Sequence, residues 1–497
     1  MKEKVLNKMN LKSGINKEKV MLLFCFLVVF IINIANISKS NIIYLTTDEQ
    51  GPFAIAAYLS GRDWSSTTSN IAYYSYGYSF IIWPLFMIIE DSSILYKACI
   101  IVNSIMLSTI VPIAYLSIKK LMKEYNVTLS LFISTCVALY SCNIVRANLA
   151  LYEAPLIFVT WVIFFMFIDL NEKSKLINFF SLGVILVYSY MIHQRMLGVL
   201  TVGIITIVFM RISKTIDDKQ ILTFIITVSA MLLFHKYFKE IIKSNVWLNS
   251  MDSLTNDYSS QIGKIINIFT IEGLFKALRG LFGQLFYIGS ATYLIGFVGI
   301  LKLFKENLHY LISKDKCSNE SVGKNINSYM FLFLTIIFTV GIGVVFMSTP
   351  HRADHIVYGR YNEIFFGPLL LISLIYIYKR DGNILKEFII SGFLLIFFAV
   401  IVDKSYGDLR YASFAKISCI GINQYYFNGE LHIYIAVIVA VIGASIIYIS
   451  RKINNNIIKY ITILLLSIVF IFTGYKVLDD SVFPQGDKWY KLSKFVD

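Results

Sequence analysis

The run VMLLFCFLVVFIINIANI, residues 20–37, decides the fold class of this chain. It carries no charge and is close to the length that an α-helix needs to cross the hydrocarbon core of a bilayer. The run is too long for the apolar part of a cleavable signal, and no small-residue cleavage site follows it. We therefore expect a retained first membrane span.

The composition extends this conclusion to the whole chain of 497 residues. Hydrophobic residues make up 57% and charged residues 15%, against about 45–50% and about 25% in soluble proteins. The net charge is +14, from 45 Lys and Arg against 31 Asp and Glu, and much of the positive charge lies in short loops between apolar runs. This pattern excludes a soluble enzyme, a disordered chain and a nucleic-acid-binding module, and it predicts an all-α integral membrane protein.

The apolar runs predict about thirteen spans in one membrane domain, 1–475, followed by a short outer tail, 476–497. The expected spans are 20–38, 94–118, 127–142, 151–170, 177–193, 196–210, 221–238, 285–304, 329–347, 363–378, 387–402, 432–450 and 460–475. The segment 73–89 is short, aromatic and contains Pro84, so we expect it to lie on the membrane surface. With this assignment, every short Lys- and Arg-rich loop falls on the cytoplasmic side together with the N-terminus.

The longer loops then face outward and carry the polar residues. They are 39–93 with its juxtamembrane helices, 239–284, 348–362 and 403–431. Within them 269–286 is amphipathic, and we expect it on the outer membrane surface. The six cysteines (25, 99, 136, 142, 317 and 419) form no disulfide framework or metal-site pattern.

Ionisable residues near the expected spans gather at the outer ends, which predicts one site at the outer interface. The stretch TTDEQ, 46–50, places Asp48 and Glu49 just after the first span. One interpretation is that Thr47 or Asp48 caps a helix that has Pro52 in its first turn. The other is that a carboxylate here takes a proton from an incoming hydroxyl.

Three further positions have a structural and a functional interpretation. Glu153, two residues before Pro155, either favours a helix N-terminus by its charge or orients an arginine or an acceptor. His193 and Arg195 lie in a tight turn, where the arginine either reaches the interface or clamps a phosphate. The stretch STPHRADHIVYGRYNE, 348–363, is a solvated loop or a donor-binding loop.

In this last stretch, Arg352, Arg360 and Tyr361 are the candidates for binding a donor. His351 and His355 are four residues apart and could share a helical face, but no third ligand accompanies them, so the pair indicates a metal site only weakly.

These positions resemble the GT-C superfamily of integral membrane glycosyltransferases, in particular the branch of protein O-mannosyltransferases and the aminoarabinose transferase. The resemblance rests on the Asp48-Glu49 pair after the first span, on the acid before Pro155 at the fourth span, and on about thirteen spans. It departs from the family in having Glu where the second motif usually has Asp, and in lacking a Lys in the second juxtamembrane stretch.

The resemblance implies a polyprenyl-phosphate sugar donor and an inverting transfer to an acceptor hydroxyl. Asp48 is then the base, with Glu49 and Glu153 beside it, and Arg195, His193, Arg352, Arg360 and Tyr361 bind the donor phosphate or substrate. The acceptor is a glycan, a protein or a lipid, and a requirement for a divalent metal stays open. The implied location is the plasma membrane, with the active site outside and no nucleic-acid partner.

Two other functions stay open at this stage. A polysaccharide polymerase or ligase would use a lipid-diphosphate donor with Arg352 and Arg360, but it leaves the Asp48-Glu49 pair unexplained. A lipid or glycan transporter would place its essential charges near the bilayer midplane, which this sequence does not show.

Overall fold

The chain folds into a bundle built almost entirely of helices. The computed structural model describes residues 2–44, 46–68, 71–171, 173–247, 259–312, 320–379, 383–410, 412–453 and 455–493. The strands within these residues form one small antiparallel hairpin of β1 (Tyr426–Phe427) and β2 (Glu430–Leu431). The predicted all-α class is therefore confirmed.

The α-helices follow one another along the chain. Their bounds are α1 (Lys2–Ile34), α2 (Thr46–Leu59), α3 (Gly77–Ile88), α4 (Ser92–Ser108), α5 (Ile110–Leu121), α6 (Val127–Ala138), α7 (Ser141–Ala147), α8 (Glu153–Asp169), α9 (Leu176–Ile192), α10 (Leu197–Ile212), α11 (Asp218–Val246), α12 (Ser259–Ile268), α13 (Ile271–Ala291), α14 (Ile295–Ile312), α15 (Glu320–Phe346), α16 (Glu363–Tyr378), α17 (Leu385–Tyr406), α18 (Ile433–Lys452), α19 (Asn456–Val477) and α20 (Phe483–Ser493).

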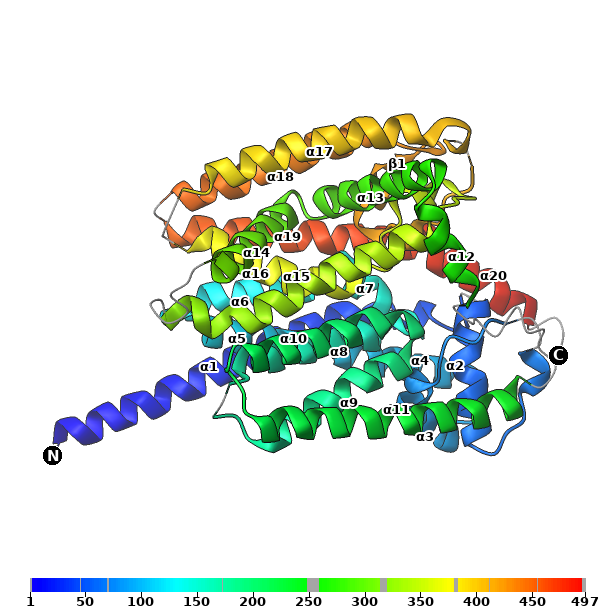
Figure 1. Ribbon diagram of the computed structural model, residues 1–497, viewed down its shortest axis with the longest axis horizontal. Helices are drawn as coiled ribbons and strands as arrows, with labels where there is room; N and C mark the ends of the chain where they lie inside the picture. The colour runs from blue at the N-terminus through cyan, green and yellow to red at the C-terminus, as the bar shows by residue number, and fades with distance from the viewer. Residues whose placement is uncertain are drawn as a thin grey trace.

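The long helices lie side by side and expose apolar side chains, as a multi-pass membrane protein requires. Figure 1 shows them running along one direction, with the start of α1 projecting from one end of the bundle. Large apolar residues such as Phe24, Phe393 and Phe472 are more than 60% exposed. Side chains of this kind are stable at such exposure when lipid rather than water surrounds them.

The expected number of thirteen spans is not confirmed. Eight of the described helices are long and apolar enough to cross a membrane, or up to ten if each of two bent pairs is one span. The bent pairs are α6 with α7, at 55°, and α13 with α14, at 113°. Some remaining apolar helices, such as α9 with 17 residues and α16 with 16, are shorter than the roughly 20 residues that a span needs.

The expected span 285–304 is not one continuous helix, because the chain turns sharply inside it. α13 ends at Ala291 and α14 begins at Ile295. Between them Tyr293 and Leu294 adopt left-handed backbone conformations, with φ of 52° and 63°. The residues around this turn are mostly apolar, with the small polar residues Ser290 and Thr292 among them, so hydropathy alone does not distinguish it from a continuous helix.

Residues 39–93, the expected first outer loop, contain the helices α2 and α3, and their position at the outer membrane surface stays a prediction. α2 begins at Thr46, well before Pro52, so Asp48 and Glu49 lie inside its first turn. The interpretation of Asp48 as the cap of a helix that starts near Pro52 is therefore wrong, and the side chain of Thr47 lies outside the described residues. An acidic first turn is favoured because the free N–H groups of a helix N-terminus attract negative charge.

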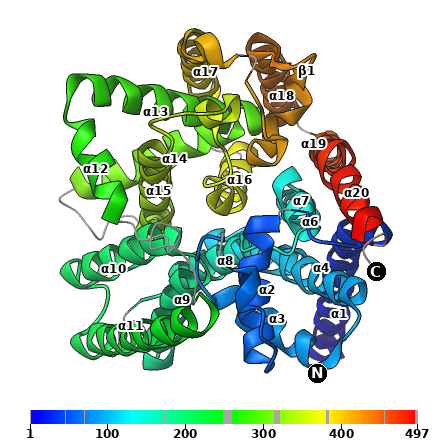
Figure 2. The same ribbon diagram turned by 90° about the vertical axis from the view of Figure 1, so that its right-hand side faces the viewer.

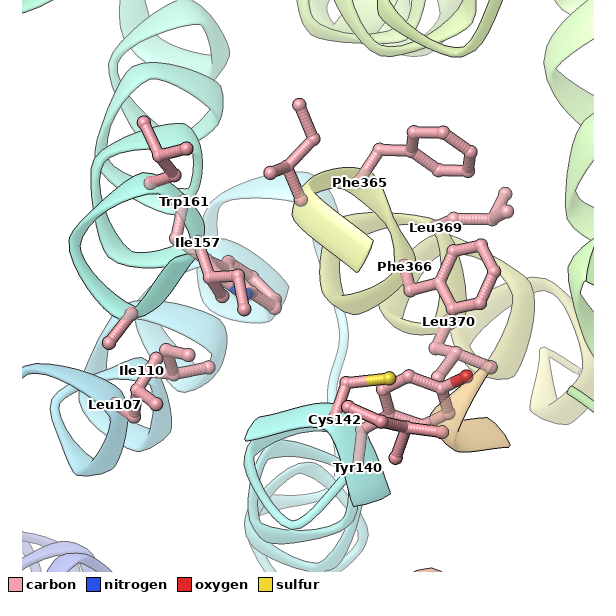
Figure 3. Packing of buried hydrophobic residues seen from close by; sticks show 14 of the residues in the cluster. Leu107, Ile110, Tyr140, Cys142, Ile157, Trp161, Phe365, Phe366, Leu369 and Leu370 are labelled. Atoms are coloured by element: carbon pink, nitrogen blue, oxygen red, sulfur yellow. The ribbon is translucent and has the colours of Figure 1, made fainter. Parts of the chain in front are cut away.

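The two helices α8 and α16 pack against each other inside the bundle (Figure 2). Figure 3 shows Ile157 and Trp161 of α8 on one side of this core and Phe365 and Phe366 of α16 on the other. All four are 3% exposed or less. Since α8 begins with Glu153 and α16 begins with Glu363, this packing brings two carboxylates to the same end of the core.

The amphipathic segment 269–286 forms most of α13, which packs against α15 and α17. Its small residues face the protein, with Gly273, Ala277 and Gly280 buried, whereas Leu274 and Phe275 are exposed. The position of this segment on the outer membrane surface stays a prediction.

Gly283 of α13 allows a polar loop to approach the helix. A Cβ atom at this position would lie 1.7 Å from the carbonyl oxygen of Ile356, in the 3₁₀-helix Ala353–Val357. Because that oxygen belongs to backbone, it cannot move aside without moving the loop that leads to Arg360.

We predict that Gly283→Ala destabilises the protein by about 1–3 kcal/mol through overpacking. The measurement is thermal unfolding of the detergent-solubilised protein. Gly341→Ala is the matched control, since an added Cβ there has no described atom within 4 Å and alanine favours the helix by about 1 kcal/mol. Equal melting temperatures for the two variants would contradict the prediction.

Candidate functional site

Four charged side chains from distant parts of the chain meet in one place. They are Asp48 of α2, Glu153 of α8, Arg195 of the 3₁₀-helix Gln194–Met196, and Arg360 of the loop before α16. We call these four residues the charged cluster. Its two acids and two bases balance each other, so the cluster as a whole carries no net formal charge.

Arg360 is the centre of the charged cluster. Its Nη1 donates to Oδ2 of Asp48 at 2.8 Å, and its Nε donates to Oε1 of Glu153 at 2.6 Å. Nη2 of Arg195 donates to the same Glu153 oxygen at 3.2 Å. Burial disfavours the charged form of Arg360, but Glu153 and Asp48 outweigh it and raise the pKa of Arg360 well above its ordinary value. Arg360 therefore stays positively charged at any physiological pH.

The charged cluster has a covered half and an accessible half. The side chains of Glu153 and Arg195 are 2% and 5% exposed, whereas those of Asp48 and Arg360 are 18% and 16% exposed. Within the described residues, Oε2 of Glu153 and Nε of Arg195 are buried without a hydrogen-bond partner. A buried guanidinium N–H without an acceptor loses free energy, so this position suits an added anionic ligand.

The loop that carries Arg360 is held from two sides. The backbone N–H groups of Gly359 and Arg360 both donate to the carbonyl oxygen of Ser418, each at 3.0 Å. On the other side Gly359 lies so close to Tyr287 that an added Cβ would be 2.0 Å from its ring. These contacts fix the backbone on which the guanidinium of Arg360 is mounted.

Glu49 anchors α2 and lies outside the charged cluster. It is fully buried, and its carboxylate accepts hydrogen bonds from the backbone N–H of Tyr44 at 2.7 Å, the hydroxyl of Tyr96 at 2.7 Å and the backbone N–H of Ala150 at 3.0 Å. These contacts tie the start of α2 to α4 and to the chain just before α8. The neighbouring Asp48 is thereby held toward Arg360.

Aromatic rings line the charged cluster. Tyr74 stacks on His193 with ring centroids 5.2 Å apart, and Tyr152 lies edge-on to the same imidazole at 5.5 Å. The guanidinium of Arg195 lies over the ring of Tyr361 at 5.3 Å. Aromatic rings that lie beside hydrogen-bonding side chains suit a ligand that has both apolar faces and hydroxyl groups.

The pKa values of two of these rings, His193 and Tyr74, differ from their ordinary values. Burial, with the positive charge of Arg195 nearby, holds the pKa of His193 well below its ordinary value. The imidazole is therefore neutral at pH 7, and its Nδ1 accepts a hydrogen bond from the N–H of Arg195 at 3.1 Å. Burial and the Asp48 carboxylate raise the pKa of Tyr74, so its hydroxyl keeps its proton.

A second ion pair lies behind the charged cluster. Arg146 of α7 makes two bonds to Glu363 of α16, from Nε at 2.7 Å and from Nη2 at 3.1 Å, and Nη2 also donates to the carbonyl oxygen of Ile417 at 3.0 Å. Both side chains are 0% exposed. The pair joins α7, the first turn of α16 and the loop that holds Arg360.

The remaining candidates lie apart from these contacts. Arg352 forms a two-bond ion pair with Asp354, at 3.0 and 2.8 Å. His355 accepts a hydrogen bond from the backbone N–H of His351 at 3.3 Å. Within the described ranges no group of three or more His, Cys, Asp or Glu side chains could hold a metal ion, and the metal requirement of the protein stays an open prediction.

Comparison with known proteins gives a fold-level likeness only. No protein-family model matches the chain, and no curated protein matches it. Similar solved structures include ArnT from Cupriavidus metallidurans in the apo state, with a TM-score of 0.47 and 9% identity over 95% of this chain and 78% of that chain. They also include the same protein bound to undecaprenyl phosphate, with a TM-score of 0.44 and 8% identity over 94% and 77% of the two chains. A likeness this distant assigns no role to any residue of this chain.

Sequence reasoning missed the partnership of Arg146 with Glu363 and the contribution of Tyr74. A signal for the first existed, because a charged residue at the end of an apolar helix needs a partner of opposite charge. No signal for Tyr74 existed, since it is one of several tyrosines in the aromatic stretch 73–78.

We predict that Glu363→Gln lowers the stability of the protein by about 3–5 kcal/mol, because it leaves the Arg146 guanidinium buried without a counter-charge. The free energy of unfolding in detergent is the measurement. Asp403→Asn, which removes the carboxylate from the more exposed pair with Arg410, serves as control and costs at most about 1 kcal/mol. The prediction fails if both substitutions have the same effect.

Proposed function

We propose that this protein is a membrane glycosyltransferase that moves a sugar from a polyprenyl-phosphate donor to an acceptor hydroxyl at the outer face of the plasma membrane. The observation that carries the proposal is the bridge that Arg360 makes between Asp48 and Glu153, with Arg195 on the same Glu153 oxygen. A carboxylate and two guanidinium groups within one partly accessible cluster are the groups that such a transfer needs.

The transfer needs a base for the acceptor. As the acceptor oxygen attacks the anomeric carbon, its proton passes to a carboxylate oxygen of Asp48, the most accessible acid of the charged cluster. The bond between the anomeric carbon and the phosphate oxygen breaks, and its electron pair stays on the phosphate. A single displacement of this kind inverts the configuration of the anomeric carbon.

The leaving phosphate gains negative charge as this bond breaks. Arg360 and Arg195 supply the positive charge that stabilises it, because guanidinium groups bind phosphate oxygens with two parallel N–H donors. The unpartnered Nε of Arg195 supports this role. When the phosphate pairs with Arg360, the Asp48 carboxylate loses part of its ion pair and has an oxygen free to accept the proton of the acceptor hydroxyl.

Glu153 and Glu49 act differently from Asp48 in this proposal. Glu153 holds both guanidinium groups in place through one oxygen, so it positions the phosphate site without touching the acceptor. Glu49 fixes α2 through its three hydrogen bonds. Tyr74, Tyr361 and the neutral His193 line the space where the sugar ring would lie.

We predict that Asp48→Asn lowers the transfer rate by about 10²–10⁴-fold, since a positioned base contributes that much. The measurement is sugar transfer from a radiolabelled polyprenyl-phosphate donor in reconstituted vesicles, together with donor binding. Donor binding should stay near that of the unmodified protein, because the amide keeps the shape of the side chain. Asp403→Asn is the control, and a wild-type rate for Asp48→Asn would refute its role as base.

We also predict that Arg360→Lys lowers the transfer rate by about 10²–10³-fold, as loss of one charge-stabilising donor does. A lysine keeps the charge but cannot reach both carboxylates and a phosphate with the fixed geometry of a guanidinium. Arg410→Lys, on an outer loop, should leave the rate unchanged. If Arg360→Lys retains full activity, positive charge alone is sufficient and the two-bond phosphate contact is not needed.

A further inference from the structure

An apolar groove lies between α17 and α18, away from the charged cluster. It has a volume of about 460 Å³ and reaches the turn between α13 and α14 at Leu294. Gly392 of α17 and Ala444 of α18 line it with the smallest side chains, and an added Cβ at Gly392 has no described atom within 4 Å. This volume falls in the range of roughly 300–1,000 Å³ that small-molecule sites occupy.

The surroundings of the groove fit a lipid tail rather than a soluble ligand. Phe393 and Ile396, which line it from α17, are 70% and 49% exposed, and Ile449 from α18 is 55% exposed. Because these side chains are stable at such exposure only in contact with hydrocarbon, the groove is open to the bilayer. A chain of methylene groups is therefore the ligand that can enter it.

Positive charge gathers at one end of the groove. Leu385, the first residue of α17, lines the groove, and Lys386 follows it directly. On α18 the ammonium group of Lys452 lies 5.6 Å from the centre of the Tyr448 ring, which also lines the groove. Glu387, the acid next to Lys386, is buried and paired with Lys305. Because Glu387 pairs with Lys305, its carboxylate does not neutralise Lys386 and Lys452 at this end of the groove.

We propose that this groove binds one acyl chain of an anionic glycerophospholipid from the cytoplasmic leaflet, with the phosphate of its headgroup at Lys386 and Lys452. The excess of Lys and Arg in short cytoplasmic loops assigns this end of the groove to the cytoplasmic side. Basic pockets between helices on that side are suited to anionic headgroups. The lipid would fill the space between α17 and α18 beside the break between α13 and α14, where Leu294 lines the groove.

The test is lipid binding to the purified full-length protein, measured by native mass spectrometry with dioleoyl phosphatidylglycerol and dioleoyl phosphatidylcholine. The unmodified protein should bind phosphatidylglycerol more tightly, because the two lipids share their tails and differ in net charge. Removing both cations in the variant Lys386→Gln/Lys452→Gln should reduce this preference by about tenfold or more. Filling the groove with Gly392→Leu should abolish tight binding of both lipids.

Two matched controls separate the groove from the general lipid surface. Gly341→Leu adds the same side chain at a glycine with open space on α15, and Lys173→Gln/Lys175→Gln removes two cations from another short loop. Both should leave binding unchanged. Equal binding of the two lipids by the unmodified protein would overturn the proposal, and so would displacement of phosphatidylglycerol by polyprenyl phosphate. The lysine variants keep the test decisive if Gly392→Leu fails to fold, since they change exposed cations only.

Discussion

The contact of one guanidinium with two carboxylates is the interaction on which the arrangement of the charged cluster depends. Arg360 is 312 residues from Asp48 and 207 residues from Glu153 along the chain, and it joins α2, α8 and the loop before α16. At the boundary of a membrane an unpaired charge of either sign is costly. The pairing therefore both assembles the site and gives each charge a partner of opposite sign.

The buried groups behind the charged cluster explain why it has one geometry. Arg146 with Glu363 and Glu49 with its three donors are shielded from water, and in such surroundings a misplaced charge is far more costly than at a surface. These contacts set the start of α2, the start of α16 and the loop at Ser418. Asp48 and Arg360 can then remain partly accessible, because the supporting structure does not rely on them alone.

Hydropathy predicted most helices, because an apolar run of sufficient length has few alternatives in a bilayer. It failed at residues 285–304, where Tyr293 and Leu294 adopt left-handed backbone conformations and turn the chain within a mostly apolar stretch. It also predicted Asp48, Glu153, Arg195 and Arg360 as candidates, since each is a charge beside an apolar run. It could not predict that Asp48 lies in the charged cluster and Glu49 outside it. The two acids are neighbours in the sequence, and the first turn of α2 points their side chains in different directions.

The sequence by itself determined that the chain is a bundle of membrane helices, because the energetic cost of charge in hydrocarbon keeps charged residues out of the long apolar runs. Only the tertiary structure decided which charges are partners. Arg360 contacts Asp48 and Glu153, whereas Arg352, eight residues earlier, contacts Asp354. The physical reason is that Coulomb attraction and hydrogen bonding act over a few ångströms in space, and the packing of α8 on α16 sets those distances.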